Sequence, residues 1–460
     1  MLSYTKIDRL NPNKRDVMQR IKDFDEVYEV VGHKQASEQA DRCMQCGDPY
    51  CHTKCPLHNF IPAWLKSVAT KDLELAFALS NETSPFPEIL GKICPHDVLC
   101  EGDCSLNDGH GAIAIGSIET HITENAFDLG YKPKFATTKL GKSVAIVGSG
   151  PAGISAATFL LRAGVEVTMY ERAARAGGLF TYGIPGFKLD KDKVQRRIDL
   201  LIEAGMKLEL NCEIGKDKSF EELENDFDAV FVGIGSTKGR YAGLDGEDAS
   251  NVHLAMEFLT KIQQRNFGEK VDNLIDVKGK KVVVIGGGDT AMDCVRTSVR
   301  EQASSVKCLY RRDEANMPGS KKEVANAKEE GVEFVFNVSP KSIKKEGDVA
   351  VAVELLTTTM SDPDESGRQK VEINEGSEYL EDADVIIYAL GFDPEVPNFI
   401  KDANLELDKW NGIIVNENYQ TSNPKIYSGG DSVRGADLAV TAAFDGREAA
   451  KKIVEAFESK

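Results

Sequence analysis

The sequence lacks any long apolar run. No stretch of its 460 residues approaches the roughly 20 consecutive apolar residues that a membrane-spanning helix needs. The first residues, MLSYTKIDRLNPNKRD, are charged and have no apolar core of the kind found in signal peptides. Basic residues are also in deficit, because 56 Lys and Arg face 74 Asp and Glu, for a net charge of −18. These features argue against nucleic acid and membranes as main partners, and we expect a cytoplasmic protein.

Cysteine is scarce outside one short region. Seven of the ten cysteines lie between Cys43 and Cys104, whereas Cys212, Cys294 and Cys308 are scattered and are expected to be small buried residues. No C-x2-C pair accompanies either glycine-rich motif described below, which argues against chemistry of the thioredoxin reductase type. Because cytoplasmic proteins rarely contain structural disulfides, the seven clustered cysteines predict metal or redox chemistry.

The stretch KSVAIVGSGPAG carries the first nucleotide motif. A buried strand leads into Gly148, Gly150 and Gly153, in the pattern G-x-G-x-x-G, and a helix follows. In such motifs the first glycine permits a tight turn, the second lets the backbone approach a pyrophosphate, and the third lets the helix pack on the strand. The next strand, VEVTMYE, ends in Glu171, where an acid can hold a ribose hydroxyl. Together these features predict a dinucleotide-binding unit rather than an ordinary βαβ unit.

A second nucleotide motif lies in KGKKVVVIGGGDTAMDC. Gly286, Gly288 and Ala291 form the variant G-x-G-x-x-A. The strand that follows ends in Arg311 and Arg312 instead of an acid. Arginine at this position favours the 2′-phosphate of NADP, so the two motifs predict FAD in the first unit and NADPH in the second.

Two further segments belong with the first unit. Gly178 and Leu179 lie in RAARAGGLFTYGIPGFKL, a glycine-bearing loop that can lie against a flavin ring without a side-chain clash. Near the C-terminus, Gly430 and Asp431 form a strand-to-helix turn, and Asp431 can bind a ribityl hydroxyl or lie near the flavin phosphates. The helix that begins near Thr441 can direct N–H groups at negative charge on reduced flavin. The alternative interpretation is that the segment with Gly178 and Leu179 is an ordinary surface loop and that Asp431 is an ordinary turn residue.

The clustered cysteines have the spacing C-x2-C-x4-C-x3-C-P, followed by C-P-x4-C-x3-C. Structural zinc sites favour two C-x2-C pairs, and only one is present here. The terminal Cys-Pro resembles bacterial ferredoxins, in which the fourth cysteine of a run ligates the other cluster. The same logic predicts one 4Fe–4S cluster on Cys43, Cys46, Cys51 and Cys104, and a second cluster on Cys55, Cys94 and Cys100.

Two such clusters need one more ligand than the seven cysteines supply. The candidates are Glu119, Thr120, His52, His58 and His96. We favour Glu119, because it lies in the otherwise apolar segment AIAIGSIET. A surface carboxylate at a helix start is the equally weighted alternative, and each histidine is expected to lie at the surface or beside the ligands.

These motifs predict an α/β protein with three parts. Residues 1–139 form a helical domain with two 4Fe–4S clusters, and no strand pattern is evident there. Residues 140–265 and 393–460 form a Rossmann-like FAD-binding domain. Residues 266–392 form a second Rossmann-like domain, for NADPH, inserted in the first.

The combined motifs also carry a family resemblance. VGSGPAG, AGGLFTYGIPGFKL, VIGGGDTAMDC, YRRDEANMPGS, SGGDSVRGADLAVTAAFDGR and CMQCGDPYCHTKCPLHNFIPAW resemble the small (beta) subunits of NADPH-dependent glutamate synthase. Similar motifs occur in the N-terminal half of dihydropyrimidine dehydrogenase and in the large subunit of NADH-dependent ferredoxin:NADP oxidoreductase. The resemblance implies FAD, NADPH and two 4Fe–4S clusters. It also implies a large (alpha) partner subunit, with FMN and a third cluster, that forms two glutamates from glutamine and 2-oxoglutarate.

Three hypotheses follow from the sequence. The chain is the electron-input subunit of glutamate synthase, or a related flavoprotein that reduces ferredoxin or another acceptor, or a non-catalytic cluster-bearing scaffold with decayed nucleotide sites. The intact glycines and the Arg311–Arg312 pair argue against the scaffold.

Overall fold

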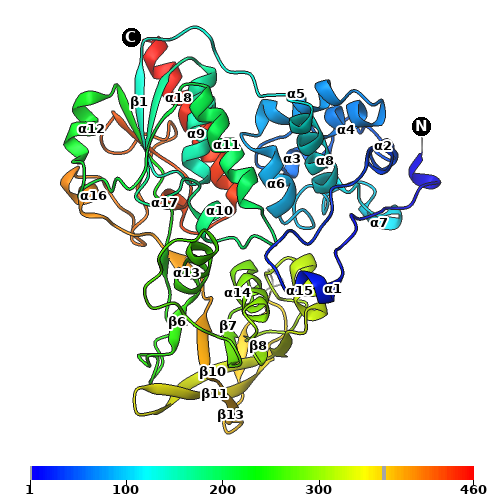
Figure 1. Cartoon of the computed structure of the whole chain (residues 1–460), viewed down its shortest axis with the longest axis vertical. Coiled ribbons are helices and arrows are strands. Elements are labelled where there is room, and N and C mark those ends of the chain that lie inside the picture. Colours follow the sequence, from blue (N-terminus) through cyan, green and yellow to red (C-terminus); the bar gives the residue numbers. More distant parts are fainter. Residues whose placement is uncertain (1–2, 365–368, 460) are drawn as a thin grey trace.

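The computed structural model describes residues 3–364 and 369–459. Figure 1 shows a group of N-terminal helices, a first α/β unit beside them and a second α/β unit below. Each α/β unit contains a parallel five-stranded sheet, and the chain leaves the first sheet, forms the second and returns. The predicted fold class is confirmed: a helical domain precedes two Rossmann-like units, the second inserted in the first. Within the described residues, no helix combines the length and apolarity needed to cross a membrane.

Short helices with buried apolar faces make up the N-terminal part. The Asp72 carboxylate caps one helix by accepting a hydrogen bond from the Leu75 N–H at 3.0 Å. Pro87 begins another, at a position where its missing N–H costs nothing. Trp64 and Leu65 are buried in the shared core. The elements are η1 (Ser3–Thr5), α1 (Val17–Arg20), α2 (His33–Asp41), α3 (Tyr50–Lys54), α4 (Ile61–Ala69), α5 (Leu73–Thr83), α6 (Pro87–Ile93), α7 (Asn107–His110) and α8 (Ile115–Asp128).

The first sheet has the strand order β16-β4-β1-β2-β3, and all of its pairs are parallel. Alternate residues of β1 serve opposite faces, as the strand period requires. Val144 and Ile146 pack with α9, α11 and α18, whereas Ala145 and Val147 pack with α12 and α16. Its elements are β1 (Ser143–Val147), α9 (Pro151–Arg162), β2 (Glu166–Tyr170), α10 (Leu179–Tyr182), α11 (Lys191–Glu203), β3 (Lys207–Glu209), α12 (Phe220–Asp226), β4 (Ala229–Val232), α16 (Asn398–Asp402), β16 (Ile426–Ser428), α17 (Asp431–Arg434) and α18 (Ala439–Glu458).

The second sheet repeats this plan in the order β6-β14-β7-β8-β9. Helices α13, α14 and α15 cover one face, and a twisted antiparallel sheet, β10 to β13, covers the other. Figure 1 shows the antiparallel strands at the lower end of the molecule. The elements are β6 (Val252–Leu254), α13 (Ala255–Asn266), β7 (Lys281–Ile285), α14 (Asp289–Arg300), β8 (Ser305–Tyr310), α15 (Lys321–Glu329), β9 (Glu333–Phe336), β10 (Val338–Glu346), β11 (Val349–Met360), β12 (Val371–Ile373), β13 (Tyr379–Asp382) and β14 (Val385–Tyr388).

The chain crosses between the two units at a small antiparallel pair, β5 (Lys238–Gly239) with β15 (Phe392–Asp393). The expected domain boundary after residue 265 differs from this topology. Strand β6 pairs with β14 of the second sheet, and α13 buries Phe258 and Ile262 in the second core. We therefore propose 140–239 and 392–460 for the first unit and 240–391 for the second.

Candidate cofactor and cluster sites

The first glycine-rich turn joins β1 to α9. At Gly148 φ is +98°, and a Cβ would lie 2.5 Å from the Gly233 carbonyl oxygen, so only glycine fits. At Gly153 a Cβ would lie 2.0 Å from the Gly148 carbonyl oxygen, which keeps the helix close to the turn. At Gly150 no atom lies within 4 Å of a Cβ position. The turn therefore has an open side at the N-terminus of α9, where a pyrophosphate can approach.

Glu171 follows β2 and lies against the same turn. One carboxylate oxygen accepts hydrogen bonds from the Ser149 N–H at 3.1 Å and its hydroxyl at 2.5 Å. The other oxygen accepts from the Ala173 N–H at 2.8 Å. The Ser149 hydroxyl oxygen also accepts from the Gly177 N–H, so it connects the turn to the following loop. We did not predict this role for Ser149, whose only sequence signal is its place inside the glycine motif.

The other residues predicted for FAD converge on the start of α9. Gly178 has a φ of +54°, and a Cβ there would lie 2.8 Å from the Gly150 Cα. A Cβ on Gly430 would lie 2.9 Å from the Ala152 Cβ. Leu179 begins α10, directly after Gly178. These positions bring the loop and the C-terminal turn together around the first glycine motif.

Asp431 and Thr441 lie at two helix starts of the C-terminal segment. Asp431 begins α17, and Thr441 lies in the first turn of α18, where its hydroxyl donates to the Leu438 carbonyl at 2.6 Å. Burial raises the pKa of Asp431 to about 7, and the carboxylates of Asp437 and Asp445 add to the rise. The carboxyl group of Asp431 is therefore a ready hydrogen-bond partner for a polar ligand group.

The second glycine-rich turn joins β7 to α14 with the same geometry. A Cβ on Gly286 would lie 2.4 Å from the Ala389 carbonyl oxygen, whereas nothing lies within 4 Å of a Cβ position on Gly288. Ala291 is fully buried inside α14, where a small residue allows close packing. This turn thus has an open side of the same kind.

Arg311 and Arg312 follow β8, beside the second turn. Arg311 is exposed and Arg312 is half-buried. Within residues 3–364 and 369–459, neither guanidinium forms an ion pair, and the buried Nε of Arg312 has no hydrogen-bond partner. An unsatisfied buried donor is costly, and a bound phosphate would satisfy it. The pair therefore fits the 2′-phosphate of NADP.

The first cysteine set surrounds a small cavity in the helical domain. Among the described residues, no three His, Cys, Asp or Glu side chains are placed to hold a single metal ion. The cavity instead has four thiols spread around it, with Leu65 and Ile115 in its apolar wall. The cysteines lining it are Cys43, Cys46, Cys51 and Cys104. These are the four that the sequence assigns to one cluster.

The second set groups Cys55, Cys94 and Cys100 with Glu119. Burial raises the pKa of all three thiols, and the charge of Glu119 raises each further. Glu119 is 6% exposed, and burial raises its pKa to about 8. One oxygen of Glu119 accepts a hydrogen bond from the Asn59 amide at 2.8 Å. Three thiols and a buried carboxyl group form a donor set suited to a cluster.

The alternative ligands lie in different surroundings. The Nδ1 atom of His52 forms a hydrogen bond with the Asn59 carbonyl oxygen, 3.0 Å away. The His96 ring packs so tightly against Gly116 that a Cβ added to Gly116 would lie 2.3 Å from the ring. His58 lies beside the His52 ring, with centroids 5.5 Å apart. Thr120 lies one residue beyond Glu119 and lines a different cavity.

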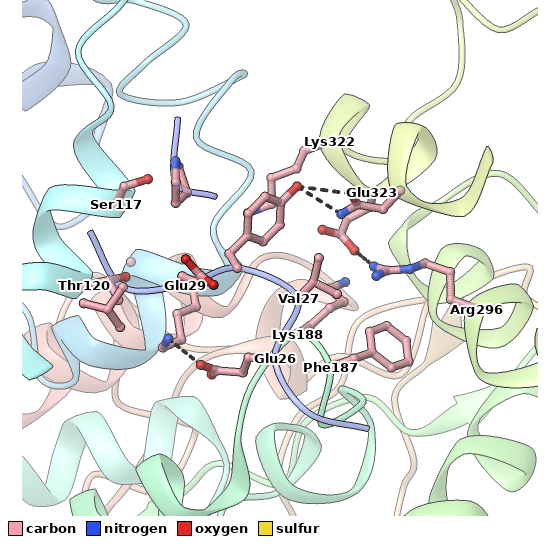
Figure 2. Close-up of a pocket in the computed structure, with 16 residues that line it drawn as sticks. Glu26, Val27, Glu29, Ser117, Thr120, Phe187, Lys188, Arg296, Lys322 and Glu323 are labelled. Carbon is pink, nitrogen blue, oxygen red and sulfur yellow. Dashed lines mark hydrogen bonds and ion pairs between the residues drawn. The ribbon is translucent and has the colours of Figure 1, made fainter. Parts of the chain in front are cut away.

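That other cavity, of about 60 Å³, lies where the parts of the molecule meet (Figure 2). Its lining comes from the N-terminal segment, from α6 and α8, from the loop before α11, and from α14 and α15. Apart from Thr120, one of the alternative cluster ligands, none of the residues predicted for cofactors or clusters lines it. Figure 2 shows Lys188 and Phe187 of the first unit beside Arg296 and Glu323 of the second.

Comparisons with known proteins agree with this geometry. The model of the pyridine nucleotide-disulphide oxidoreductase family matches residues 142–446. The model of dihydropyrimidine dehydrogenase domain II, 4Fe–4S cluster, matches residues 20–131, which supports iron–sulfur chemistry rather than zinc. Fold and sites thus define a pyridine nucleotide oxidoreductase with an N-terminal 4Fe–4S domain. The glutamate synthase [NADPH] small chain of Escherichia coli K12 is 47% identical over 98% of this chain and 98% of its own. The chain belongs to the family of these small chains, and the predicted resemblance is confirmed.

Two other similarities are informative. The oxidoreductase AegA of E. coli K12 is 46% identical over 97% of this chain, which matches 69% of AegA. The fold is similar to a solved structure of Mycobacterium tuberculosis FprA in complex with NADPH, with a TM-score of 0.58. The matched region covers 69% of this chain and 86% of the FprA chain. Its 21% identity makes this a likeness of fold alone.

Proposed function

We propose that this chain is the electron-input subunit of glutamate synthase. It oxidises NADPH through FAD and passes electrons through two 4Fe–4S clusters to a large subunit, which forms glutamate from glutamine and 2-oxoglutarate. When bound, FAD would supply the chemistry that takes a hydride from NADPH and releases single electrons, and the clusters would supply one-electron carriers.

The observation that carries the proposal is the contact between the second cysteine set and the first α/β unit. Cys55 and Cys94 pack against the hydrophobic core that contains Val144, Ile146 and α9. A cluster held there would lie beside the unit proposed for FAD, where it would supply a one-electron acceptor at the border of the helical domain. Cys43, Cys46, Cys51 and Cys104 lie further along the same domain, around their own cavity.

The chain's own residues hold the nucleotides. Gly148, Gly150 and Gly153 bring the FAD pyrophosphate to the N-terminus of α9, and Glu171 holds its ribose. Gly178, Leu179, Gly430, Asp431 and Thr441 enclose the remainder of the flavin. For NADPH, Gly286, Gly288 and Ala291 form the pyrophosphate site, and Arg311 and Arg312 bind the 2′-phosphate. The seven cysteines and Glu119 hold the clusters.

A second candidate function is electron transfer from NADPH to ferredoxin or another acceptor. The similarity to AegA favours it, because that relative is named only as an oxidoreductase and is nearly as similar as the synthase chains. The assignment of FAD, NADPH and clusters is the same in both proposals, and only the acceptor differs.

The test is NADPH oxidation by the complex, purified from its own cells without oxygen. We expect oxidation only when glutamine and 2-oxoglutarate are both present, with glutamate formed. Omission of either substrate is the matched control. NADPH oxidation that does not depend on glutamine or 2-oxoglutarate but increases with ferredoxin would favour the second function. Failure to oxidise NADPH with any artificial acceptor would contradict both functions and favour a non-catalytic scaffold.

A further inference from the structure

Helix α14 is the element of the second unit that begins at the proposed NADPH turn, directly after Gly288. Further along α14, Asp293, Arg296 and Arg300 are buried and face the rest of the molecule. Contacts from two directions converge on these three side chains. One set comes from the first α/β unit and the other from the N-terminal segment 12–31, here called the strap.

The first unit reaches α14 through the loop between α10 and α11. The Lys188 ammonium lies 2.9 Å from the Asp293 carboxylate. The Phe187 ring lies under two guanidinium groups, 4.4 Å from Arg296 and 4.0 Å from Arg300. Cation–π contacts of this kind stabilise most when they are shielded from water. The loop between α10 and α11, which flanks the proposed flavin site, therefore contacts α14, which starts at the proposed NADPH site.

The strap reaches α14 through Glu330, the residue after α15. Arg20 is 1% exposed, and its guanidinium lies 3.0 Å from Glu330 and 2.8 Å from Glu329. The Glu330 carboxylate also pairs with Arg296 at 2.9 Å and Arg300 at 2.7 Å. Figure 1 shows α1, which ends in Arg20, beside α15.

The strap holds the other parts at the same time. The Val27 N–H donates to the Phe187 carbonyl at 3.0 Å, so the strap is bonded to the loop that contacts α14. The Glu26 carboxylate accepts from the Asp190 N–H at 3.0 Å and pairs with Lys92 of the helical domain at 2.8 Å. Figure 2 shows Val27 of the strap beside Lys188 and Phe187 of the loop.

The two units also contact each other directly in other places. Tyr182 of α10 lies edge-on to Phe267, with ring centroids 6.0 Å apart, and the Arg175 guanidinium lies 3.2 Å from the Glu269 carboxylate, just after α13. The β5–β15 pair joins only two residues from each strand. Such a short ribbon fixes little by itself, whereas hydride transfer needs its two reacting atoms within a few tenths of an ångström of the right separation. The contacts on α14 are therefore expected to contribute to the relative orientation of the units.

We propose that the strap, together with Phe187 and Lys188, clamps α14 and holds the nicotinamide of NADPH in register with the flavin. Arg20 and Lys188 are positioning residues in this clamp, and neither is expected to touch the reacting atoms. The inference rests on the proposed function, because that function places NADPH at the start of α14.

Arg20→Ala is the decisive variant. Its fold is expected to survive, because Glu330 keeps both Arg296 and Arg300 as partners. Arg20→Lys retains the charge and serves as the rescue variant, and Lys188→Met tests the clamp from the flavin side. Lys328→Ala is the control, because Lys328 lies on α15 and forms an exposed pair with Glu314, outside the clamp.

The main measurement is anaerobic stopped-flow reduction of the flavin by NADPH in the FAD-loaded and cluster-loaded protein. In Arg20→Ala and Lys188→Met we expect the limiting rate to fall about tenfold or more, with NADPH affinity changed less than about twofold. Arg20→Lys should recover part of the rate, and Lys328→Ala should match the unaltered protein. An unchanged rate in Arg20→Ala, or equal losses of rate and affinity, would overturn the clamp.

Hydrogen exchange provides a readout that does not depend on NADPH. We expect faster exchange in residues 184–190 and 289–300 of Arg20→Ala than in the unaltered protein or Lys328→Ala. If NADPH fails to reduce even the unaltered protein, the proposed function is wrong, and exchange alone decides the clamp. Unchanged exchange would then overturn it.

Discussion

At the scale of single residues, Glu119 lies where a carboxylate is costly. It is buried among Cys55, Cys94 and Cys100, and its one hydrogen-bond donor in the described structure is the Asn59 amide. A carboxylate in such a place is costly unless a strong partner compensates it. Coordination of iron would supply that partner, and it would also complete the count of eight ligands.

Replacing Glu119 with Ala is expected to remove the second cluster and leave the first. The protein should lose about half of its bound iron and sulfide, because each 4Fe–4S cluster carries four of each. Iron analysis and low-temperature paramagnetic resonance of the reduced protein would measure the loss.

The control for this variant is Glu124→Gln, on the same helix. Glu124 pairs with Arg196 at 2.6 Å and lies outside the cysteine set. The Glu124→Gln variant should keep the full iron content. Full iron in Glu119→Ala would mean that another residue completes the second cluster.

Arg312 is expected to decide between NADPH and NADH. In Arg312→Ala, one charge-assisted interaction with the 2′-phosphate is lost, worth about 2 kcal/mol, or roughly thirtyfold in kcat/KM for NADPH. The value for NADH should change little, since NADH has no 2′-phosphate. Steady-state kinetics with both nucleotides would measure this. Arg172→Ala, at the equivalent place after β2, is the control, and equal losses for both nucleotides would contradict the assignment.

The sequence predicted these residues to different degrees. Cysteine spacing, together with the ligand order of two-cluster ferredoxins, grouped Cys104 with a set about fifty residues earlier, and the structure brings them around one cavity. Glu119 was favoured only because its neighbours are apolar. Asn59 could not be predicted, because it meets Glu119 across 60 residues of chain and no local pattern marks that contact.

At the scale of elements, the end of α15 combines burial with dense charge. Burial alone would raise the pKa of Glu330, but hydrogen bonds from the Arg296 and Arg300 guanidiniums lower it to about 2. A lowered folded-state pKa stabilises the protein above the ordinary value of 4.5, and this contribution is lost as the pH falls from there towards 2.

This linkage predicts acid weakening of the second unit. Between about pH 4.5 and pH 2 the unaltered protein should lose on the order of 3 kcal/mol from this group. Glu330→Gln should be less stable at pH 7 and should lack that part of the acid dependence. Urea unfolding across this pH range is the measurement, with Glu314→Gln, at an exposed pair, as the control. If the free energy of unfolding fell equally with pH in Glu330→Gln and in the unaltered protein, the linkage would be refuted.

Elements with a strong local signature were predictable, and others were not. The strand, glycine turn and helix at β7 mark a Rossmann unit, so the sequence suggested that the unit begins there. Strand β6 precedes that motif, has only three residues and includes the polar His253, so its pairing with β14 carries no local signal. The antiparallel strands β10 to β13 were not predicted, although β11 begins with the apolar run VAVAV, which is rich in β-branched residues as strands are.

At the scale of the whole molecule, the helical domain and the first α/β unit share a core. Phe86 lies edge-on to Phe180 at 5.2 Å, and both are buried. The Arg197 guanidinium pairs with the Glu88 carboxylate at 2.7 Å, and both side chains are inaccessible to solvent. Breaking such a pair would leave an uncompensated buried charge. We therefore expect these two parts to behave as one cooperative body.

Cleavage of the linker tests this expectation. A protease site inserted between Ala136 and Thr137, ahead of an exposed stretch, would cut the chain without touching that core. The two fragments should remain together in size-exclusion chromatography and unfold in one thermal transition. Separation into two fragments under native conditions would show that the helical domain is independent.

The return of the chain from the second unit to the first also has a consequence for biosynthesis. Strand β16 and helix α18 complete the first sheet and cover α9, yet they follow the whole second sheet in the chain. The second sheet lies between residues 252 and 388 and is complete earlier. Domains generally fold as units during synthesis. During synthesis the second unit can therefore form before the first, and the site proposed for FAD is complete only after β16 and α18 have been made.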